Sequence, residues 1–250
     1  MKNFYIDKSS LYYGELFEID KGITIHVPTL SEIRKYGELK YYQMVHTLCS
    51  VGIDLCWQLE EIGQPFDEIS DFELFCQLLC KQFSSKDTKI LFGDKLDFSK
   101  MGLFIKDNSL CLIQKDPETG EKIEINEVTY FIIVSYLREI HNLKRDDRVA
   151  GTKSCRIAFI EDAKMEYEAR KNETPKPVLL PMISTMVNID GFKRNDQTVW
   201  DMNIYAFMDS IKRISKIRNS NLLLQSGYSG FGVDLKKIKK DELNYMGELD

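Results

Sequence analysis

The sequence has few residues of the kind on which catalysis most often depends. Its 250 residues include three histidines, His26, His46 and His141, and no G-x-S-x-G sequence supplies a nucleophile for a catalytic triad. Neither G-x-x-x-x-G-K-[ST] nor G-x-G-x-x-G occurs, and the single glycine-rich stretch, residues 227–232, follows an expected helix instead of opening one. The sequence therefore predicts a protein that is not an enzyme, with no catalytic residues and no cofactor.

A disulfide framework and a metal site are also not expected. The cysteines form no C-x-x-C pair, and no secretory signal precedes them. Cys76 and Cys80 would share a helix face, but zinc needs two further ligands at similar local spacing. We therefore predict reduced thiols buried among apolar neighbours and no metal. The six residues are Cys49, Cys56, Cys76, Cys80, Cys111 and Cys155.

Long apolar runs are missing as well. The longest, residues 130–137, is far shorter than the roughly 20 residues of a membrane span. Residues 1–7 carry charge where a signal peptide would need an apolar core. With 29% charged and 43% hydrophobic residues and a net charge of −5, the composition is that of a globular protein. We expect no membrane association, and a chain that stays in the compartment where it is made.

What is present predicts an α+β fold that is mainly α-helical, with an N-terminal strand and a small central antiparallel β meander. Alternating residues in 16–27 predict the strand. Thr29 and Glu32 form a capping-box pattern before a helix to about residue 49, which Gly37 weakens. A short helix is expected over residues 54–61.

A second capping-box pattern, Ser70 to Glu73, begins the next helix. The meander is expected from strands at residues 103–105, 110–113 and 122–125, separated by turn-forming residues at 106–109 and 116–120. The helix after Ser70 should carry five side chains on one core-facing side: Phe72, Phe75, Cys76, Leu79 and Phe83.

Residues 130–137 are compatible with a strand, but a helix is favoured because Asn126 can cap it and basic residues follow. After a loop at 148–153, a charged helix is expected over 154–171. Prolines at 175, 177 and 181 predict an extended stretch. We accordingly divide the chain into an N-terminal α+β region, 1–150, and a C-terminal helical region, 151–250, with a loose boundary near 172–181.

The last long helix is expected from Thr198 to Gln225. Its apolar side chains are spaced as in a heptad seam, which is too short for an isolated coiled coil and is better suited to packing on the core or on another subunit. The seam consists of Trp200, Ile204, Phe207, Ile211 and Ile214.

Charge is distributed unevenly near the C-terminus. Residues 210–240 hold eight basic side chains against one acid, Asp234. Nucleic-acid binding is one explanation, because phosphate contacts need such a patch. The run contains no recognised reading motif, and an acidic protein partner or an acidic face of another copy explains it equally well.

The order of these signals resembles the tail assembly chaperones encoded in phage tail gene clusters of siphophages. The resemblance lies in the strand leading into residues 28–33 and 36–42, in residues 71–75, and in residues 200–207 with 222–224 and the tail 229–238. The chain is longer than the short members of that family, and the central meander is a departure. A structural tail or baseplate protein of the virion could show the same patterns.

The resemblance implies a non-enzymatic protein in the cytoplasm of the infected bacterial host. It would bind the tape measure protein, keep it soluble while the tail tube assembles, contact other tail proteins and self-associate. A structural virion protein is the first alternative, and a nucleic-acid-binding phage regulator is the second. The candidate partner-binding residues are Met202, Tyr205, Lys212, Lys216, Tyr228, Phe231, Lys236, Lys237, Tyr245 and Met246.

Overall fold

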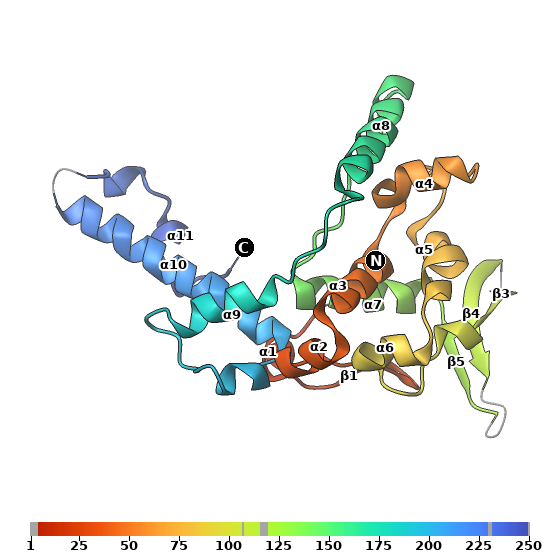
Figure 1. Cartoon of the computed structure of the whole chain (residues 1–250), viewed down its shortest axis with the longest axis horizontal. Helices are drawn as coiled ribbons and strands as arrows, with labels where there is room; N and C mark the ends of the chain where they lie inside the picture. Colours follow the sequence, from red (N-terminus) through yellow and green to blue (C-terminus); the bar gives the residue numbers. More distant parts are fainter. Residues whose placement is uncertain (1–4, 107, 116–119, 230–231, 250) are drawn as a thin grey trace. The chain divides into compact units, whose positions relative to one another are not determined.

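The structure, a computed structural model, describes residues 5–106, 108–115, 120–229 and 232–249. The chain divides into two compact units. Unit 1 contains residues 1–28 and 32–177, and unit 2 contains residues 29–31 and 178–250. The described residues are mainly helical, with one two-stranded and one three-stranded antiparallel sheet (Figure 1). The predicted α+β, mainly helical class is confirmed.

Unit 1 begins with α1 (Lys8–Tyr13) and a hairpin of β1 (Phe17–Asp20) and β2 (Ile23–Ile25). The single strand predicted over 16–27 is therefore wrong. The chain reverses at Gly22, whose φ of 83° lies in the left-handed region that favours glycine. Ile23 and Ile25 still face the core, with 0% and 1% of their surface exposed.

The helix predicted over residues 29–49 is divided into α2 (Leu30–Tyr36) and α3 (Glu38–Cys49). Gly37 separates them with φ 103° and ψ 107°, far from helical values. The expected weakening at Gly37 is thus a complete break. The next short helix, α4 (Cys56–Glu61), follows a 3-10 turn over Gly52–Leu55, close to the prediction of 54–61.

The second capping box is confirmed: the Glu73 amide donates to Ser70 Oγ at 3.2 Å, and the Ser70 amide donates to Glu73 Oε2 at 2.9 Å. The regular helix that it opens, α5 (Asp71–Leu74), is short. The chain continues as a π-helical turn (Phe75–Leu79) and a 3-10 turn (Cys80–Gln82). The predicted helix is thus present as an uninterrupted helical stretch that changes type and ends at Gln82, one residue before Phe83. The other four predicted core residues, Phe72, Phe75, Cys76 and Leu79, are buried as expected.

An aromatic cluster forms the centre of unit 1. The Phe75 ring lies 4.9 Å from that of Tyr130 and 5.7 Å from that of Phe98, and Phe92 meets Phe98 edge to face at 5.6 Å. Such edge-to-face pairs stabilise a core beyond their buried area. Phe92 ends α6 (Ser85–Phe92), a helix that the sequence analysis did not predict.

The predicted meander is confirmed. It consists of β3 (Gly102–Lys106), β4 (Ser109–Lys115) and β5 (Lys122–Ile125), paired antiparallel in that order. Residue 107 in the first expected turn and residues 116–119 in the second lie outside the described residues. Leu112 and Ile125, which are directly opposite each other on β4 and β5, are fully buried on one face of the sheet, and Cys111 is buried on the other face.

Residues 130–137 are helical, as favoured, within α7 (Glu127–His141). Asn126 Oδ1 caps it by accepting the Thr129 amide at 2.9 Å. The charged helix is α8 (Lys153–Arg170), within one residue of the prediction. Figure 1 shows α8 beside α4, and the two helices are connected by ion pairs and by a ring contact between Trp57 and Tyr167 at 5.1 Å. In these contacts Arg156 pairs with Glu60, and Lys164 pairs with Glu61 at 3.5 Å.

Unit 2 contains α9 (Leu179–Val187), a 3-10 turn (Thr198–Asp201), α10 (Ile204–Tyr228), a second 3-10 turn (Leu235–Lys237) and α11 (Lys240–Leu243). The extended stretch predicted through Pro181 is wrong. Pro181 is the third residue of α9. The N–H groups of the first turn have no carbonyl partner within the helix, so the missing N–H of proline costs no hydrogen bond there. In the described part of the chain, no helix is long and apolar enough to cross a membrane.

Candidate functional site

The start of α10 differs from the sequence prediction. The helix begins at Ile204, six residues after the expected Thr198, because Asn203 Oδ1 caps it by accepting the Ala206 amide at 2.8 Å. Ile204 and Phe207 are fully buried, as the predicted seam requires. Trp200 belongs instead to the preceding 3-10 turn, so the seam is shorter than five residues on one helix.

The C-terminal segment, residues 235–249, folds back along α10 (Figure 1). Arg213 Nη1 donates to the carbonyl oxygens of Tyr245 and Gly247 at 2.6 and 2.8 Å. Lys216 Nζ donates to the Glu248 carbonyl oxygen at 2.6 Å. These contacts attach the acidic end of the chain to the basic part of the helix.

The C-terminal contacts change the role of one predicted partner-binding residue. Only 15% of the Lys216 side chain is exposed, because it lies beneath the C-terminal segment, 3.5 Å from the Asp241 carboxylate. Arg213 and Ser220, which make equivalent contacts, were not among the predicted site residues. Local sequence gives no signal for Ser220, since the segment that buries it is distant along the chain.

Other predicted residues of this surface are well exposed. Tyr228 and Met246 have 81% and 80% of their surface accessible, and Tyr245 has 43%. Lys236 and Lys237 are exposed on the 3-10 turn. The structure therefore distributes these residues along the end of α10 and the C-terminal segment, where they form no enclosed site.

Four predicted partner-binding residues are less exposed or lie outside the described residues. Met202, Tyr205 and Lys212 are partly covered. Met202 lies before α10, and its carbonyl oxygen accepts the Leu30 amide at 2.9 Å. Phe231 is outside the described residues.

An apolar cavity of about 230 Å³ lies between α9 and α10. The sequence analysis missed it because α9 itself was not predicted. Methionine side chains are flexible and polarisable, which suits them to apolar surfaces that accept varied partners. The lining residues are Pro181, Met182, Thr185, Met186 and Ile211.

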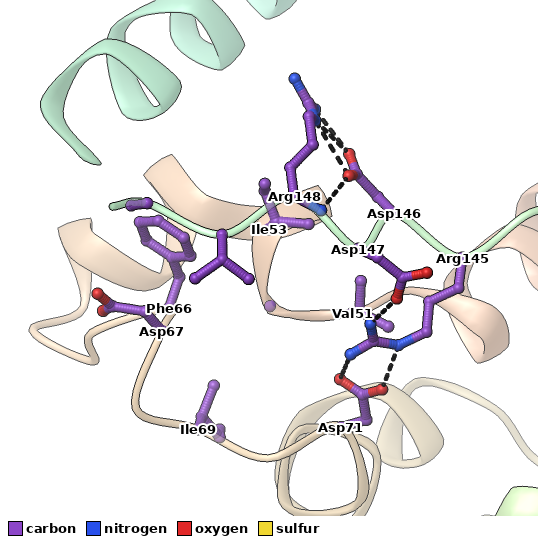
Figure 2. A pocket seen from close by; sticks show the side chains of 13 residues that line it. Val51, Ile53, Phe66, Asp67, Ile69, Asp71, Arg145, Asp146, Asp147 and Arg148 are labelled. Carbon is purple, nitrogen blue, oxygen red and sulfur yellow. Dashed lines mark hydrogen bonds and ion pairs between the residues drawn. The ribbon is translucent and has the colours of Figure 1, made fainter. Parts of the chain in front are cut away.

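A second cavity, of about 180 Å³, lies in unit 1 where the loop after α7 meets the segments before α4 and α5 (Figure 2). Figure 2 shows Arg145 between two carboxylates: its Nε and Nη2 bind Asp71 at 2.9 and 3.2 Å, and its Nη1 binds Asp147. Hydrogen bonds to Asp71 raise the pKa of the Arg145 guanidinium.

Arg148 pairs in the same way with Asp146, through bonds of 2.6 to 3.0 Å that lower the pKa of the carboxyl group. Both arginines that line the cavity therefore already have carboxylate partners, and an incoming anion would have to displace them. This charge network holds the loop between α7 and α8 against the rest of unit 1. We therefore assign this charge network a structural role and not a role in ligand binding.

The three histidines have environments that differ in burial and in partner. His26 Nε2 lies 3.2 Å from both carboxylate oxygens of Glu32. His46 is exposed on α3, and His141 is buried at the end of α7. Burial lowers the pKa of His141 to about 4, so its imidazole is neutral near pH 7.

All six cysteines are unpaired, and five of them are buried. Burial raises the pKa of Cys76 to about 12 and that of Cys80 to about 11, so both are thiols at neutral pH. Over the described ranges, no group of three or more His, Cys, Asp or Glu side chains is arranged to hold a metal ion.

Comparison with known proteins bears on the C-terminal part of the chain. A family model described as the YomV second domain matches residues 170–250. This range covers α9, α10 and the C-terminal segment, about a third of the chain. No curated protein and no solved structure gives a significant match.

Proposed function

We propose that this protein is a tail assembly chaperone that binds the phage tape measure protein and keeps it soluble during tail tube assembly. Such a protein acts in the host cytoplasm, without catalysis, and needs accessible apolar side chains. The matched family is phage-related, which agrees with a role in phage assembly.

Unit 2 provides the observation that carries the proposal. Leu180, Leu222 and Met246 each have more than 60% of their surface exposed, and the methionine-lined cavity lies between α9 and α10. Apolar side chains that remain accessible in this way are available to contact apolar segments of another protein. An unfolded apolar partner would bury them and gain roughly 25 cal/mol for each Å² of apolar surface removed from water.

Co-expression tests the proposal directly. The tape measure protein of the same gene cluster should be mostly insoluble alone, and should become soluble and co-purify when this chain is present. Replacing Leu180, Leu222 and Met246 together by serine should abolish the rescue without lowering the melting temperature, since all three are exposed. The same change at the exposed Ile62 of unit 1 is the matched control.

Two results would contradict the proposal. One is that the wild-type chain neither solubilises the tape measure protein nor co-purifies with it. The other is that mass spectrometry finds the chain in purified phage particles at the copy number of a tail subunit, which identifies a structural virion protein. A chaperone leaves before the particle is complete.

A further inference from the structure

The C-terminal segment is held on α10 mainly through its main chain. Arg213 and Lys216 donate to three carbonyl oxygens, those of Tyr245, Gly247 and Glu248. Such contacts do not depend on which side chains the bound segment carries. They require only a turn whose carbonyl groups point toward the helix.

Ser220 shows how closely the segment covers the helix. Its hydroxyl donates to the Glu242 carbonyl oxygen at 2.6 Å, and the residue has 0% of its surface exposed. Its neighbours Asn219 and Asn221 are both exposed. A serine at this place on a surface helix is therefore buried by the C-terminal segment.

The charges of α10 and of the end of the C-terminal segment are complementary. The covered part of α10 carries Lys212, Arg213 and Lys216, whereas residues 241–249 contain three acids and no base. The Asp241 carboxylate lies 3.5 Å from Lys216 Nζ. The basic part of α10 is thus already covered by the acidic residues 241–249.

Gly227 permits the approach of the segment at its other end. A Cβ atom at Gly227 would lie far inside van der Waals contact with the Leu235 side chain. A side chain at this position would therefore force Leu235, at the start of the segment, to give up its present contact with α10. A substitution at residue 227 therefore loosens the segment while the side chains that contact it, Arg213, Lys216 and Ser220, stay unchanged.

The segment is not part of a core. Neither its 3-10 turn nor α11 has a buried residue. Its polar contacts with α10 are hydrogen bonds and an ion pair, which add little net stability because water offers alternative partners when the segment leaves. The segment can therefore be displaced by a peptide of similar chemistry.

We propose that the basic face of α10 formed by Arg213, Lys216 and Ser220 is a docking site for a short acidic peptide segment of a partner protein. The chain's own residues 241–249, which contain three acids and no base, occupy this site as an intramolecular competitor. The inference rests on the proposed function only in naming the tape measure protein as the natural source of the segment.

The test uses the full-length chain and a fluorescent peptide with the acidic sequence of residues 241–250, whose binding is followed by fluorescence anisotropy. Wild type should bind the peptide weakly, because its own segment fills the site. Gly227→Ala should bind it about 10-fold or more tightly, since the apparent Kd falls as the fraction of open sites rises. Adding Arg213→Ala and Lys216→Ala to that variant should abolish binding, whereas adding Arg218→Ala, at an exposed base on the same helix, should not.

Three outcomes would overturn the inference. The first is equal affinity of wild type and Gly227→Ala for the peptide. The second is peptide binding that survives the loss of Arg213 and Lys216. The third is displacement of the peptide by a single-stranded oligonucleotide that binds more tightly, since this result would identify a nucleic-acid site. A peptide with its acids changed to amides should bind more weakly, and unchanged affinity would contradict the charge argument. Because the tape measure protein takes no part, failure here is distinguishable from failure of the co-expression experiment.

Discussion

The Tyr41 hydroxyl donates a hydrogen bond to Nε2 of His141 at 2.5 Å, in the interior of unit 1. The other ring nitrogen, Nδ1, donates to the Leu137 carbonyl oxygen at 2.7 Å. Both nitrogens of a neutral imidazole are therefore satisfied, and Tyr41 connects α3 to the end of α7. Protonation of His141 would break the bond from Tyr41, because Nε2 could no longer accept.

This relationship predicts a loss of stability in weak acid. The pKa of His141 falls from 6.5 to about 4 on folding. The contribution of the neutral imidazole to the free energy of unfolding is therefore complete above pH 6.5. It decreases below that pH, because the unfolded chain takes up a proton there and the folded chain does not. Between pH 6.5 and pH 5 the free energy of unfolding should fall by about 1.5 kcal/mol from this group. Urea unfolding at a series of pH values measures it.

The matched comparison is His141→Gln, which should be less stable but should lack this part of the pH dependence. His46→Gln, at an exposed position, should keep it. An unchanged slope in His141→Gln would show that other groups cause the loss.

Gly37 should be intolerant of a side chain although space is available. Nothing lies within 4 Å of a Cβ built there, but its φ is 103°. Gly37→Ala should lower the free energy of unfolding by roughly 1–2 kcal/mol, because L-residues disfavour left-handed backbone. Gly151→Ala is the control, since Gly151 has equal space and no positive φ, and its melting temperature should stay close to that of wild type.

Removal of the Asn203 cap should destabilise unit 2. Asn203→Ala should cost about 1 kcal/mol, because the Ala206 amide would lose its acceptor at a buried helix end. Asn221→Ala, at an exposed position within α10, should have no such cost. Equal denaturation midpoints for the two variants would contradict the assignment of Asn203 as the cap.

The Arg145–Asp71 pair should be coupled more strongly than an ordinary surface pair. It is bidentate, and 41% and 27% of the two side chains are exposed. A double-mutant cycle should give a coupling free energy of about 0.5–1 kcal/mol, and this energy should decrease as salt is added. The more exposed Arg170–Glu166 pair on α8 should give a smaller value, and the opposite order would contradict the role assigned to the Arg145 network.

Thiol labelling should distinguish one cysteine from the rest. Cys155 is half-buried, whereas the other five are buried. Iodoacetamide at pH 8 should therefore modify Cys155 first, and the others only after unfolding, because access and thiolate formation are both suppressed. Mass spectrometry of peptides from the native protein measures this. Rapid labelling of Cys76, whose pKa is raised to about 12, would contradict the packing described.

Local chemistry explains which elements were predictable. The capping box at Ser70, the cap at Asn126, the turns of the meander and the charged composition of α8 each act within a few residues, so the sequence indicates them directly. The predictions that were wrong or incomplete concern elements whose conformation depends on contacts with distant parts of the chain. Residues 75–79 adopt a π-helical turn within the aromatic cluster, and α9 forms despite Pro181, its apolar side packed in unit 2.

The candidate site divides in the same way. The basic character of α10 follows from composition. Tyr228 and Met246 were named from the sequence as candidate contact residues, and the structure decided that both are exposed. The cover over Lys216 and Ser220 could not be predicted, because hydrogen bonds from side chains to main-chain carbonyl groups leave no pattern in the sequence of the segment that accepts them.

The sequence by itself thus determined the class of the fold, the thiol state expected of the cysteines and the position of the basic run, since composition, periodicity and capping are local properties. Only the tertiary structure decided that Tyr41 meets His141, where α10 begins, and that residues 235–249 lie on its basic face. Each of these depends on groups brought together from distant parts of the chain, where burial and exclusion of water select one partner among many that the sequence would allow.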